Sequence, residues 1–317
     1  MKKKIRRWAA LLLVRLLIAL TRLMPRRVGL RLFSFLGGAA FALYRKDRRR
    51  ALRNLALAFP QSDPMIVTAM AKGCFRALGR NAYDTLRLTY LSKDTVLGLC
   101  TIEGEEHWRK AYDAGRGVVG LSGHIGCWEL LGAYVACKGY KLNVIYREMK
   151  DKRLDALLIG MRRRFGIPSI PRGASAVSGF KVLKRGEILA LLIDQDMDVD
   201  GIFVPFFGVP AHTPRGAAAF ALRSGAAIVP LAIHMQSDGS HHITVLPALE
   251  TPSERLSEAE RVDELTRRCA QALESLIRIY PQQWVWFHDR WRKRDAEREA
   301  DEQAAFAAEE SGYGKRG

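Results

Sequence analysis

Acidic residues are almost missing from the first fifth of the 317-residue chain. Residues 1–60 contain 16 lysines and arginines but one acid, Asp47, so this segment has a formal charge of +15. The other 257 residues contain 35 basic and 32 acidic residues and are close to neutral. The net charge of +18 therefore belongs to the N-terminus, which favours a negatively charged partner for that segment.

Long uninterrupted apolar runs are also lacking. The segments WAALLLVRLLIALTRLM (8–24) and VGLRLFSFLGGAAFALY (28–44) are hydrophobic, but Arg15 and Arg22 interrupt the first and no small-residue cleavage pattern follows it. A spanning helix needs about 20 apolar residues, and a secretory signal ends in a cleavage site. We expect residues 1–45 to form an amphipathic or marginally spanning anchor on the cytoplasmic face of the inner membrane. Two ordinary core helices with basic flanks are the alternative.

Cysteines are few, and none forms a C-x-x-C pair. The chain has an odd number of them, namely Cys74, Cys100, Cys127, Cys137 and Cys269. This pattern argues against a disulfide framework and against a zinc site, and it fits a reducing compartment. The basic N-terminus also lacks the exposed aromatic platforms that stack on bases, so we expect no binding to nucleic acid.

Strand-like and helix-like segments alternate after residue 90. The expected strands are 117–122, 141–147, 187–194, 226–235 and 241–247, and the expected helices between and after them are 127–139, 151–165, 175–186, 213–225 and 257–280. This alternation predicts an α/β fold, with a central, mostly parallel or mixed sheet flanked by helices and with N-terminal membrane-anchoring helices. We expect three parts: the anchor 1–45, a body 46–294 and a charged, disordered tail 295–317.

The stretch VGLSGHIGCWELLG (119–132) places a histidine and a glutamate where a strand is followed by a helix. We expect His124 to open the helix that carries Glu129. From the first turn, the imidazole can turn back toward the carboxylate, which would fix the tautomer of His124 and raise its basicity. This is a base and its orienting acid without a nucleophile. A helix-capping histidine and a solvent-facing glutamate are the alternative.

Two nucleophiles and a calcium loop compete with this interpretation. GLSGH is one residue out of register with the G-x-S-x-G elbow, so we do not expect Ser122 to be a nucleophile. Nothing marks Cys127 as a thiol of low pKa. DQDMDVDG (194–201) resembles the start of an EF-hand loop, but position 207, where the bidentate Glu is needed, is Phe. No metal site is therefore predicted.

Asp194 ends an apolar strand, where an ionised side chain is costly without a partner. Arginines 162–164, in the expected helix 151–165, are candidate partners. A buried pair of Asp194 with one of them would place an arginine near His124, where it could hold a phosphate or stabilise an oxyanion. A solvated helix face is the alternative. VPFFG (204–208) adds an apolar surface suited to an acyl chain.

Six motifs then occur in a fixed order. They are H-x-x-x-x-E after a strand, YR at 146–147, MRRRFG at 161–166, DQD at 194–196, VPFFG at 204–208 and PQQWVWFHDRWRKR at 281–294. Together they resemble the late acyltransferases of lipid A biosynthesis, the lauroyl and myristoyl transferases, which are similar to the wider glycerolipid and lysophospholipid acyltransferases. The similarity covers residues 5–294 and implies that the body 46–294 is the acyltransferase domain.

The resemblance implies roles for several residues. The family's dyad matches His124 and Glu129, and its essential aspartate matches Asp194. Its essential helix arginine matches Arg162, with Arg163 as the alternative if the register slips by one residue. The motif YR places Arg147 among the expected substrate-binding residues.

The family also implies a reaction at a membrane. A fatty acyl group passes from an acyl-carrier-protein thioester, or from acyl-CoA, to a hydroxyl of a lipid A precursor. His124 would be the base, Glu129 would orient it, and Arg162, held by Asp194, would bind a phosphate or the thioester oxygen. The expected partners are inner-membrane lipids, acyl carrier protein and the glycolipid acceptor, with no cofactor, because a thioester is already activated.

One departure and two alternatives remain open. The family usually has Arg after the His of its last motif, whereas this chain has Asp289 in WFHDR. A lysophospholipid or other glycolipid acyltransferase that uses acyl-CoA would show similar motifs. A catalytically inactive membrane protein that only binds lipid is the alternative from another class, and the intact His124 and Glu129 argue against it.

Overall fold

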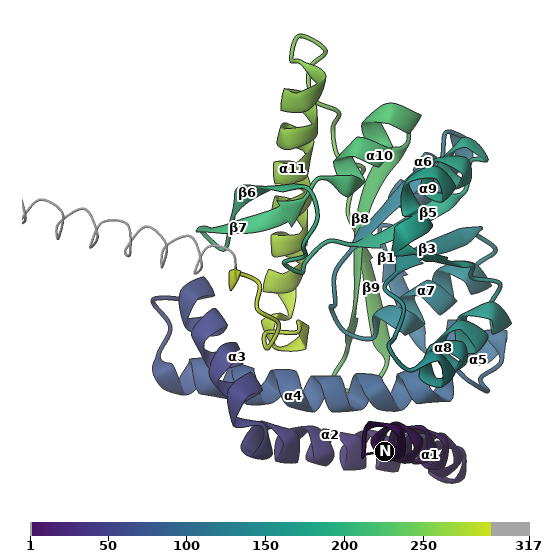
Figure 1. Ribbon diagram of the computed structural model, residues 1–317, viewed down its shortest axis with the longest axis vertical. Coiled ribbons are helices and arrows are strands. Elements are labelled where there is room, and N and C mark those ends of the chain that lie inside the picture. Colours follow the sequence, from purple (N-terminus) through teal and green to yellow (C-terminus); the bar gives the residue numbers. More distant parts are fainter. Residues whose placement is uncertain (1, 293–317) are drawn as a thin grey trace, which may run out of the picture.

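The computed structural model describes residues 2–292, and its centre is a mixed sheet (Figure 1). The central sheet of this range has seven strands in the order β1-β9-β8-β2-β5-β3-β4. These strands are β1 (Cys100–Glu103), β2 (Val118–Ser122), β3 (Leu142–Tyr146), β4 (Ser169–Pro171), β5 (Ile188–Leu192), β8 (Ala227–Met235) and β9 (His241–Val245). All neighbouring strands run parallel except β8 and β9. The predicted fold class is thus confirmed as a mostly parallel mixed sheet flanked by helices.

Helices cover both faces of this sheet. They are α1 (Lys2–Leu23), α2 (Arg26–Leu43), α3 (Arg45–Ala58), α4 (Pro64–Arg87), α5 (Lys93–Gly98), α6 (Glu105–Asp113), α7 (Trp128–Cys137), α8 (Lys152–Arg164), α9 (Ser175–Lys184), α10 (Gly216–Ser224) and α11 (Glu258–Ile279), with the 3-10 turns η1 (Arg172–Ala174) and η2 (Pro281–Gln283). One hydrophobic cluster joins α9, α10 and α11 to the sheet, and a second joins α6, α7 and α8 to it. Successive side chains of β2 point to opposite faces of the sheet, so Val119 and Leu121 belong to the first cluster and Val118 belongs to the second.

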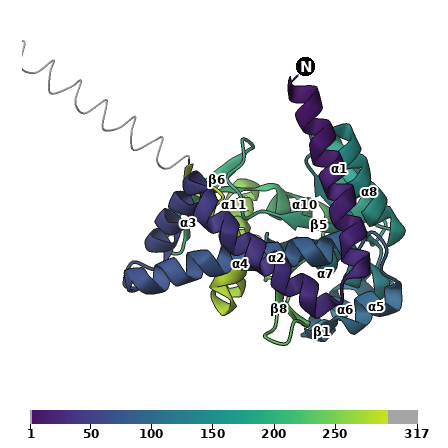
Figure 2. The same cartoon turned by 90° about the horizontal axis from the view of Figure 1, so that it is seen from below.

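A layer of helices lies under the carboxyl ends of the parallel strands. Figures 1 and 2 show α1, α2 and α4 along one side of the molecule, with α1 continuing beside α8. The last residue of β8, Met235, packs with Phe33 of α2 and Tyr83 of α4. Because β2 and β5 run in the same direction as β8, their carboxyl ends also face this layer.

Glycines allow α2 and α4 to approach closely. A Cβ atom on Gly37 would lie 2.1 Å from the carbonyl oxygen of Phe75, and one on Gly79 would lie 2.0 Å from that of Phe33. Any larger residue would push the two backbones apart. The second helix of the basic N-terminus is therefore packed firmly onto the body of the protein.

No helix within residues 2–292 has the length and apolar character needed to cross a bilayer. The membrane anchor expected in residues 1–45 stays a prediction. The tail expected at 295–317 lies outside the described residues.

The structure corrects two local predictions. The helix expected over 213–225 begins only at Gly216, as α10, because residues 213 and 214 belong to β7 (Val209–Pro214), which pairs with β6 (Gly201–Phe206). The VPFFG segment offers no open surface for an acyl chain, because the hairpin folds back and buries Phe206 and Phe207 against tryptophans of the C-terminal motif.

Candidate active site

His124 lies in a short loop between β2 and α7. It does not open the helix, because α7 begins only at Trp128. Gly126 makes the turn possible: its φ is +54°, and a Cβ there would lie 1.9 Å from the carbonyl oxygen of Ile233. The loop is held against the helical layer, since the thiol of Cys127 contacts the carbonyl oxygen of Asn81 on α4 at 3.6 Å. His124 is therefore fixed at the carboxyl edge of the sheet, where functional residues of α/β proteins gather.

Asp194 is the direct partner of His124. It follows β5, the strand next to β2, so the two strand ends bring the residues together although they are 70 positions apart. One carboxylate oxygen accepts from Nδ1 of His124 at 2.9 Å, and the other accepts from the backbone N–H of His124 at 2.7 Å. The indole N–H of Trp284 donates a third hydrogen bond at 2.7 Å. Gly123 permits this approach, because a Cβ there would lie 3.1 Å from the carboxylate.

The pair changes the acidity of both groups. Burial raises the pKa of Asp194, but the charge and hydrogen bond of His124 and the donor from Trp284 outweigh it and hold that pKa at about 2. Burial lowers the pKa of His124, but the charge and hydrogen bond of Asp194 and the charge of Glu129 outweigh it, so the pKa lies above its usual value. With Nδ1 bonded to a carboxylate, Nε2 is the nitrogen that can accept a proton.

Glu129 and Arg162 form a second pair. Glu129 lies in the first turn of α7, and Arg162 in the last turn of α8. The guanidinium donates from Nη2 at 2.6 Å and from Nε at 2.9 Å to the two carboxylate oxygens, and the side chains are 12% and 11% exposed. This two-pronged geometry holds both groups in one orientation.

The predicted partners were therefore exchanged. We expected His124 with Glu129 and Asp194 with Arg162, and the structure pairs His124 with Asp194 and Glu129 with Arg162. The physical reason is that α7 starts four residues beyond His124. Glu129 therefore points toward α8, and the neighbouring end of β5 takes the position beside the imidazole.

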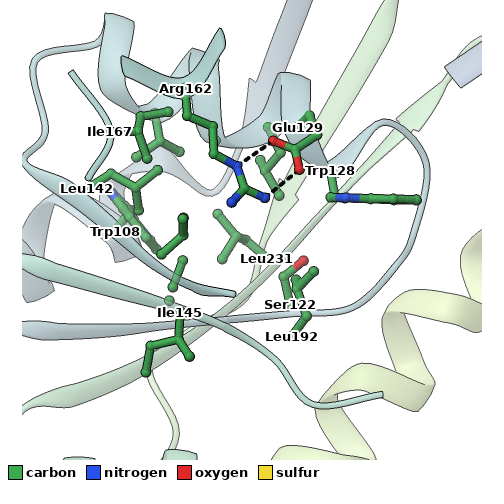
Figure 3. A pocket seen from close by; sticks show the side chains of 16 residues that line it. Trp108, Ser122, Trp128, Glu129, Leu142, Ile145, Arg162, Ile167, Leu192 and Leu231 are labelled. Carbon is green, nitrogen blue, oxygen red and sulfur yellow. Dashed lines mark hydrogen bonds and ion pairs between the residues drawn. The ribbon is translucent and has the colours of Figure 1, made fainter. Parts of the chain in front are cut away.

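An apolar pocket lies beneath the Glu129–Arg162 pair (Figure 3). It is enclosed between the sheet and the helices α6 and α7, with Trp108 and Leu142 among its lining residues. Besides Glu129 and Arg162, Ser122 is the lining residue with a charged or hydroxyl side chain. Trp128 lines the same pocket and also packs edge-on against His124, with ring centroids 4.9 Å apart. The imidazole thus lies next to the end of the pocket at Trp128 and Glu129, which is here called its mouth.

Two further residues from the sequence motifs, Arg147 and Asp289, do not line the pocket. Arg147 is exposed, two positions beyond the pocket residue Ile145. Asp289, the departure in the last motif, forms ion pairs with Arg50 and Arg53 of α3, with 3.3 Å between Asp289 and Nε of Arg50. The carboxylate thus connects the C-terminal motif to α3, and an arginine at this position could not form these ion pairs.

Sequence reasoning missed three participants. Trp284 belongs to the motif at 281–294, but nothing in its spacing shows that its indole would reach Asp194. Trp108 occurs in an ordinary amphipathic helix, and its place in the pocket depends on the crossing of α6 over the sheet. Ser122 was considered as a nucleophile and set aside, although a strand-end hydroxyl beside His124 was a signal that could have been used.

Comparison with known proteins places the chain in a family. A sequence model described as "Bacterial lipid A biosynthesis acyltransferase" matches residues 2–293. The phosphatidylinositol mannoside acyltransferase of Mycolicibacterium smegmatis is 24% identical, over 86% of this chain and 88% of that protein. The lipid A biosynthesis lauroyltransferase of Escherichia coli is 26% identical over 86% and 87%, and the palmitoleoyltransferase of the same organism is 26% identical over 82% and 85%. The chain belongs to the bacterial lipid A biosynthesis acyltransferase family.

Proposed function

We propose that the protein transfers a fatty acyl chain from an acyl-carrier-protein thioester to a hydroxyl of a lipid A precursor at the inner face of the inner membrane. The observation that carries this proposal is the His124–Asp194 pair at the mouth of an apolar pocket. A histidine of raised pKa with one free nitrogen can deprotonate a hydroxyl, and the pocket beside it suits an acyl chain. Family membership supports the same reaction class.

The proposed reaction is a direct transfer. Nε2 of His124 accepts the proton of the acceptor hydroxyl while the hydroxyl oxygen bonds to the thioester carbonyl carbon. The carbonyl π electrons move to the oxygen, which becomes an oxyanion. When the oxyanion collapses, the carbon–sulfur bond breaks, and the imidazolium returns its proton to the leaving thiolate. Asp194 orients the imidazole and stabilises its charged form. A thioester is already activated, so the proposed reaction needs no metal and no cofactor.

Glu129 and Arg162 have a different role in this proposal from the expected one. Since each neutralises the other, Arg162 is not a free cation for a phosphate. The pair instead fixes the pocket mouth between α7 and α8, and the negative charge of Glu129 adds to the basicity of His124. The exposed Arg147 beyond the pocket is available for a phosphate of the acceptor.

The basic N-terminus supports a site of action on a membrane. Apolar side chains of α1 are exposed at helical spacing, namely Trp8, Leu12, Leu13, Leu16, Leu20 and Leu23. Leu11 and Thr21 on the other side of α1 are buried. Such a helix suits the plane of an anionic bilayer surface. The carboxyl ends of β2 and β5 face the same helical layer, so an acceptor embedded in the membrane would meet His124 from that side.

The similarity to a phosphatidylinositol mannoside acyltransferase favours a second candidate acceptor. Two of the relatives named here transfer acyl chains in lipid A biosynthesis, and the third is a phosphatidylinositol mannoside acyltransferase. A mannosylated phosphoinositide is therefore the second candidate acceptor, and acyl-CoA is the second candidate donor. Both acceptors are membrane glycolipids that present a hydroxyl next to anionic groups.

A direct assay tests the proposal. The purified protein is incubated with acyl-ACP or acyl-CoA and with vesicles that contain a lipid A precursor, a phosphatidylinositol mannoside or a lysophospholipid, and thiol release and acylated lipid are both measured. We expect acylation of the lipid A precursor from acyl-ACP and at least a hundredfold loss in His124→Ala. Thiol release without an acylated lipid would identify a thioesterase. An unchanged rate in folded His124→Ala would refute the assignment of the base.

A further inference from the structure

Ser122 is a buried hydroxyl that the proposed reaction does not yet use. It is the last residue of β2, and its side chain lies on the same face of the sheet as Gly120, toward the pocket. The residue is 5% exposed, and its Oγ has no hydrogen-bond partner among the described residues. Figure 3 shows Ser122 beside Leu192, below Trp128 and Glu129, with its hydroxyl on the side of these two residues.

An unpartnered hydroxyl at this depth needs an explanation. Buried polar side chains almost always have a partner, and a serine near the end of a strand can usually reach one. The other lining residues on the sheet side are apolar or glycine, including Gly120, Ala190 and Leu192. An atom of the bound substrate would supply the hydrogen-bond partner that the Ser122 hydroxyl lacks in the free protein.

The position of Ser122 identifies which substrate atom that is. In the proposed reaction, the alkyl chain occupies the pocket and the acceptor oxygen lies next to Nε2 of His124. The carbonyl carbon must then lie between the two, at the pocket mouth. Ser122 is two residues before His124 and lines that mouth. Arg162 directs Nε and Nη2 at Glu129, and its Nη1 contacts Ser169. Trp108, whose indole N–H is also unpartnered, packs on Gly120, which is two residues further from His124 than Ser122 is.

We propose that the Ser122 hydroxyl donates a hydrogen bond to the carbonyl oxygen of the bound acyl thioester and stabilises the oxyanion that forms there. The inference rests on the proposed acyl transfer. A donor that has no other partner in the free protein is already oriented for the charge that develops, and it loses no competing hydrogen bond when the substrate binds.

The geometry argues against Ser122 as a nucleophile. A serine nucleophile shares a hydrogen bond with its base. Nδ1 of His124 is bonded to Asp194, and Oγ of Ser122 has no bond to the imidazole. Ser122 also lies within β2 and not on a strained turn after it. No acyl-serine intermediate is therefore expected.

The variant Ser122→Ala tests the inference, with Ser275→Ala on the exposed side of α11 as a matched control. We expect kcat to fall about a hundredfold in Ser122→Ala, the usual scale for one oxyanion donor, while the KM for the acceptor changes little. Because the hydroxyl is unpartnered in the free protein, its removal should leave Tm equal or higher. Ser275→Ala should keep the wild-type kcat.

Each other outcome has a distinct meaning. A kcat within threefold of wild type, or a lowered Tm that accounts for the loss, would overturn the inference. A loss confined to 3-hydroxyacyl donors would show that Ser122 binds a hydroxyl of the chain and would overturn the carbonyl assignment, as would a protein acylated at Ser122 in intact-mass spectra. If the wild type transfers no acyl chain from any donor, the proposed function itself is refuted. This outcome differs from an active wild type with an equally active Ser122→Ala, which refutes only the role of Ser122.

Discussion

The pairing of His124 with Asp194 has a direct consequence for the pH dependence of the rate. The base must be neutral to accept a proton, and Asp194 raises the pKa of His124 above its usual value of about 6.5. The rate should therefore rise with pH through a pKa above that value. In Asp194→Asn the carboxylate charge is lost, so the acid limb of kcat/KM should move to lower pH while the rate falls by roughly a hundredfold or more.

The control for this prediction is Asp198→Asn. Asp198 is exposed and pairs with Arg292 on the surface, so its loss should change neither the limb nor the rate. Profiles of kcat/KM from pH 5 to 9 would test the pair of variants. An acid limb that stays in place in active Asp194→Asn would show that another group sets the titration.

The His124–Asp194 and Glu129–Arg162 pairs should also respond independently to mutation. Glu129 and Arg162 share two hydrogen bonds, so the loss in Glu129→Gln/Arg162→Lys should be well short of the sum of the single losses. Asp194→Asn/Arg162→Lys joins residues from different pairs, and its effects on the free energy of unfolding should add within about 0.5 kcal/mol. Urea unfolding of all five variants measures both cycles. Strong coupling between Asp194 and Arg162 would contradict the observed pairing.

Much of this site could be predicted from the sequence at the scale of single residues. His124, Glu129 and Asp194 were singled out because they stand next to buried strands, where charged groups are costly without a partner. Arg162 was selected from the arginines 162–164 by the family resemblance. The partners differ from the expected ones because residues that are close along the chain need not be neighbours in space. Which residue faces which depends on the residue where α7 begins and on the neighbour relation of β2 and β5, and neither is encoded in a short motif.

At the scale of elements, most strands of the central sheet were predicted, and the hairpin outside that sheet was not. The strands 117–122 and 187–194 appear with boundaries shifted by one or two residues. The hairpin of β6 and β7 was missed: Pro205, Pro210 and Pro214 disfavour a strand, but an antiparallel pair outside the central sheet tolerates them. Phe206 and Phe207 then pack inward, because contact with Trp284 and Trp286 removes their apolar surface from water.

The length of the pocket along the strands predicts the preferred length of the acyl chain. The pocket extends from the level of Ser122 to that of Leu142, which lies level with Val118 through β5. Four residues of strand correspond to about 13 Å. Carbon–carbon bonds of about 1.5 Å give roughly 1.25 Å per methylene, so about ten methylenes fit. The wild type should prefer donors of about 10 to 12 carbons by this strand-and-bond geometry.

Trp108 should restrict the space that is available to the acyl chain. It lines the pocket and packs against Gly120, where a Cβ would lie 3.2 Å from the indole ring. Trp108→Leu widens the pocket at the level of Gly120 and should shift the preference toward longer chains. The matched control is Tyr140→Leu, because Tyr140 packs on the ring of Trp108 but is not a lining residue. Competition among acyl donors of 8 to 16 carbons, followed by mass spectrometry of the product lipid, measures the shift. An unchanged preference in Trp108→Leu would show that the chain is bound elsewhere.

At the scale of the whole molecule, charge and exposed apolar surface lie on the same side as the active site. Residues 1–60 carry a formal charge of +15, and the layer formed by α1, α2 and α4 faces the carboxyl ends of β2 and β5 (Figure 2). Basic residues near an anionic surface contribute about 1 kcal/mol each. The exposed leucines of α1 would add burial among acyl chains. Electrostatic and apolar contacts should therefore both contribute to membrane binding, and salt should weaken that binding without abolishing it.

Vesicle flotation with matched variants tests this arrangement. We expect the wild type to float with vesicles that contain phosphatidylglycerol and to bind pure phosphatidylcholine less. Leu12 and Leu16 are 70% and 55% exposed on the outer side of α1, so Leu12→Asp/Leu16→Asp should lower binding at least tenfold, because two carboxylates would have to approach the acyl region. Leu256→Asp, on an exposed leucine of the body, is the control and should bind as the wild type does. In a detergent assay with a short-chain acceptor, the α1 variant should retain its kcat, because His124 and Asp194 do not contact α1. Equal flotation of the α1 variant and the wild type would place the membrane contact on another face of the molecule.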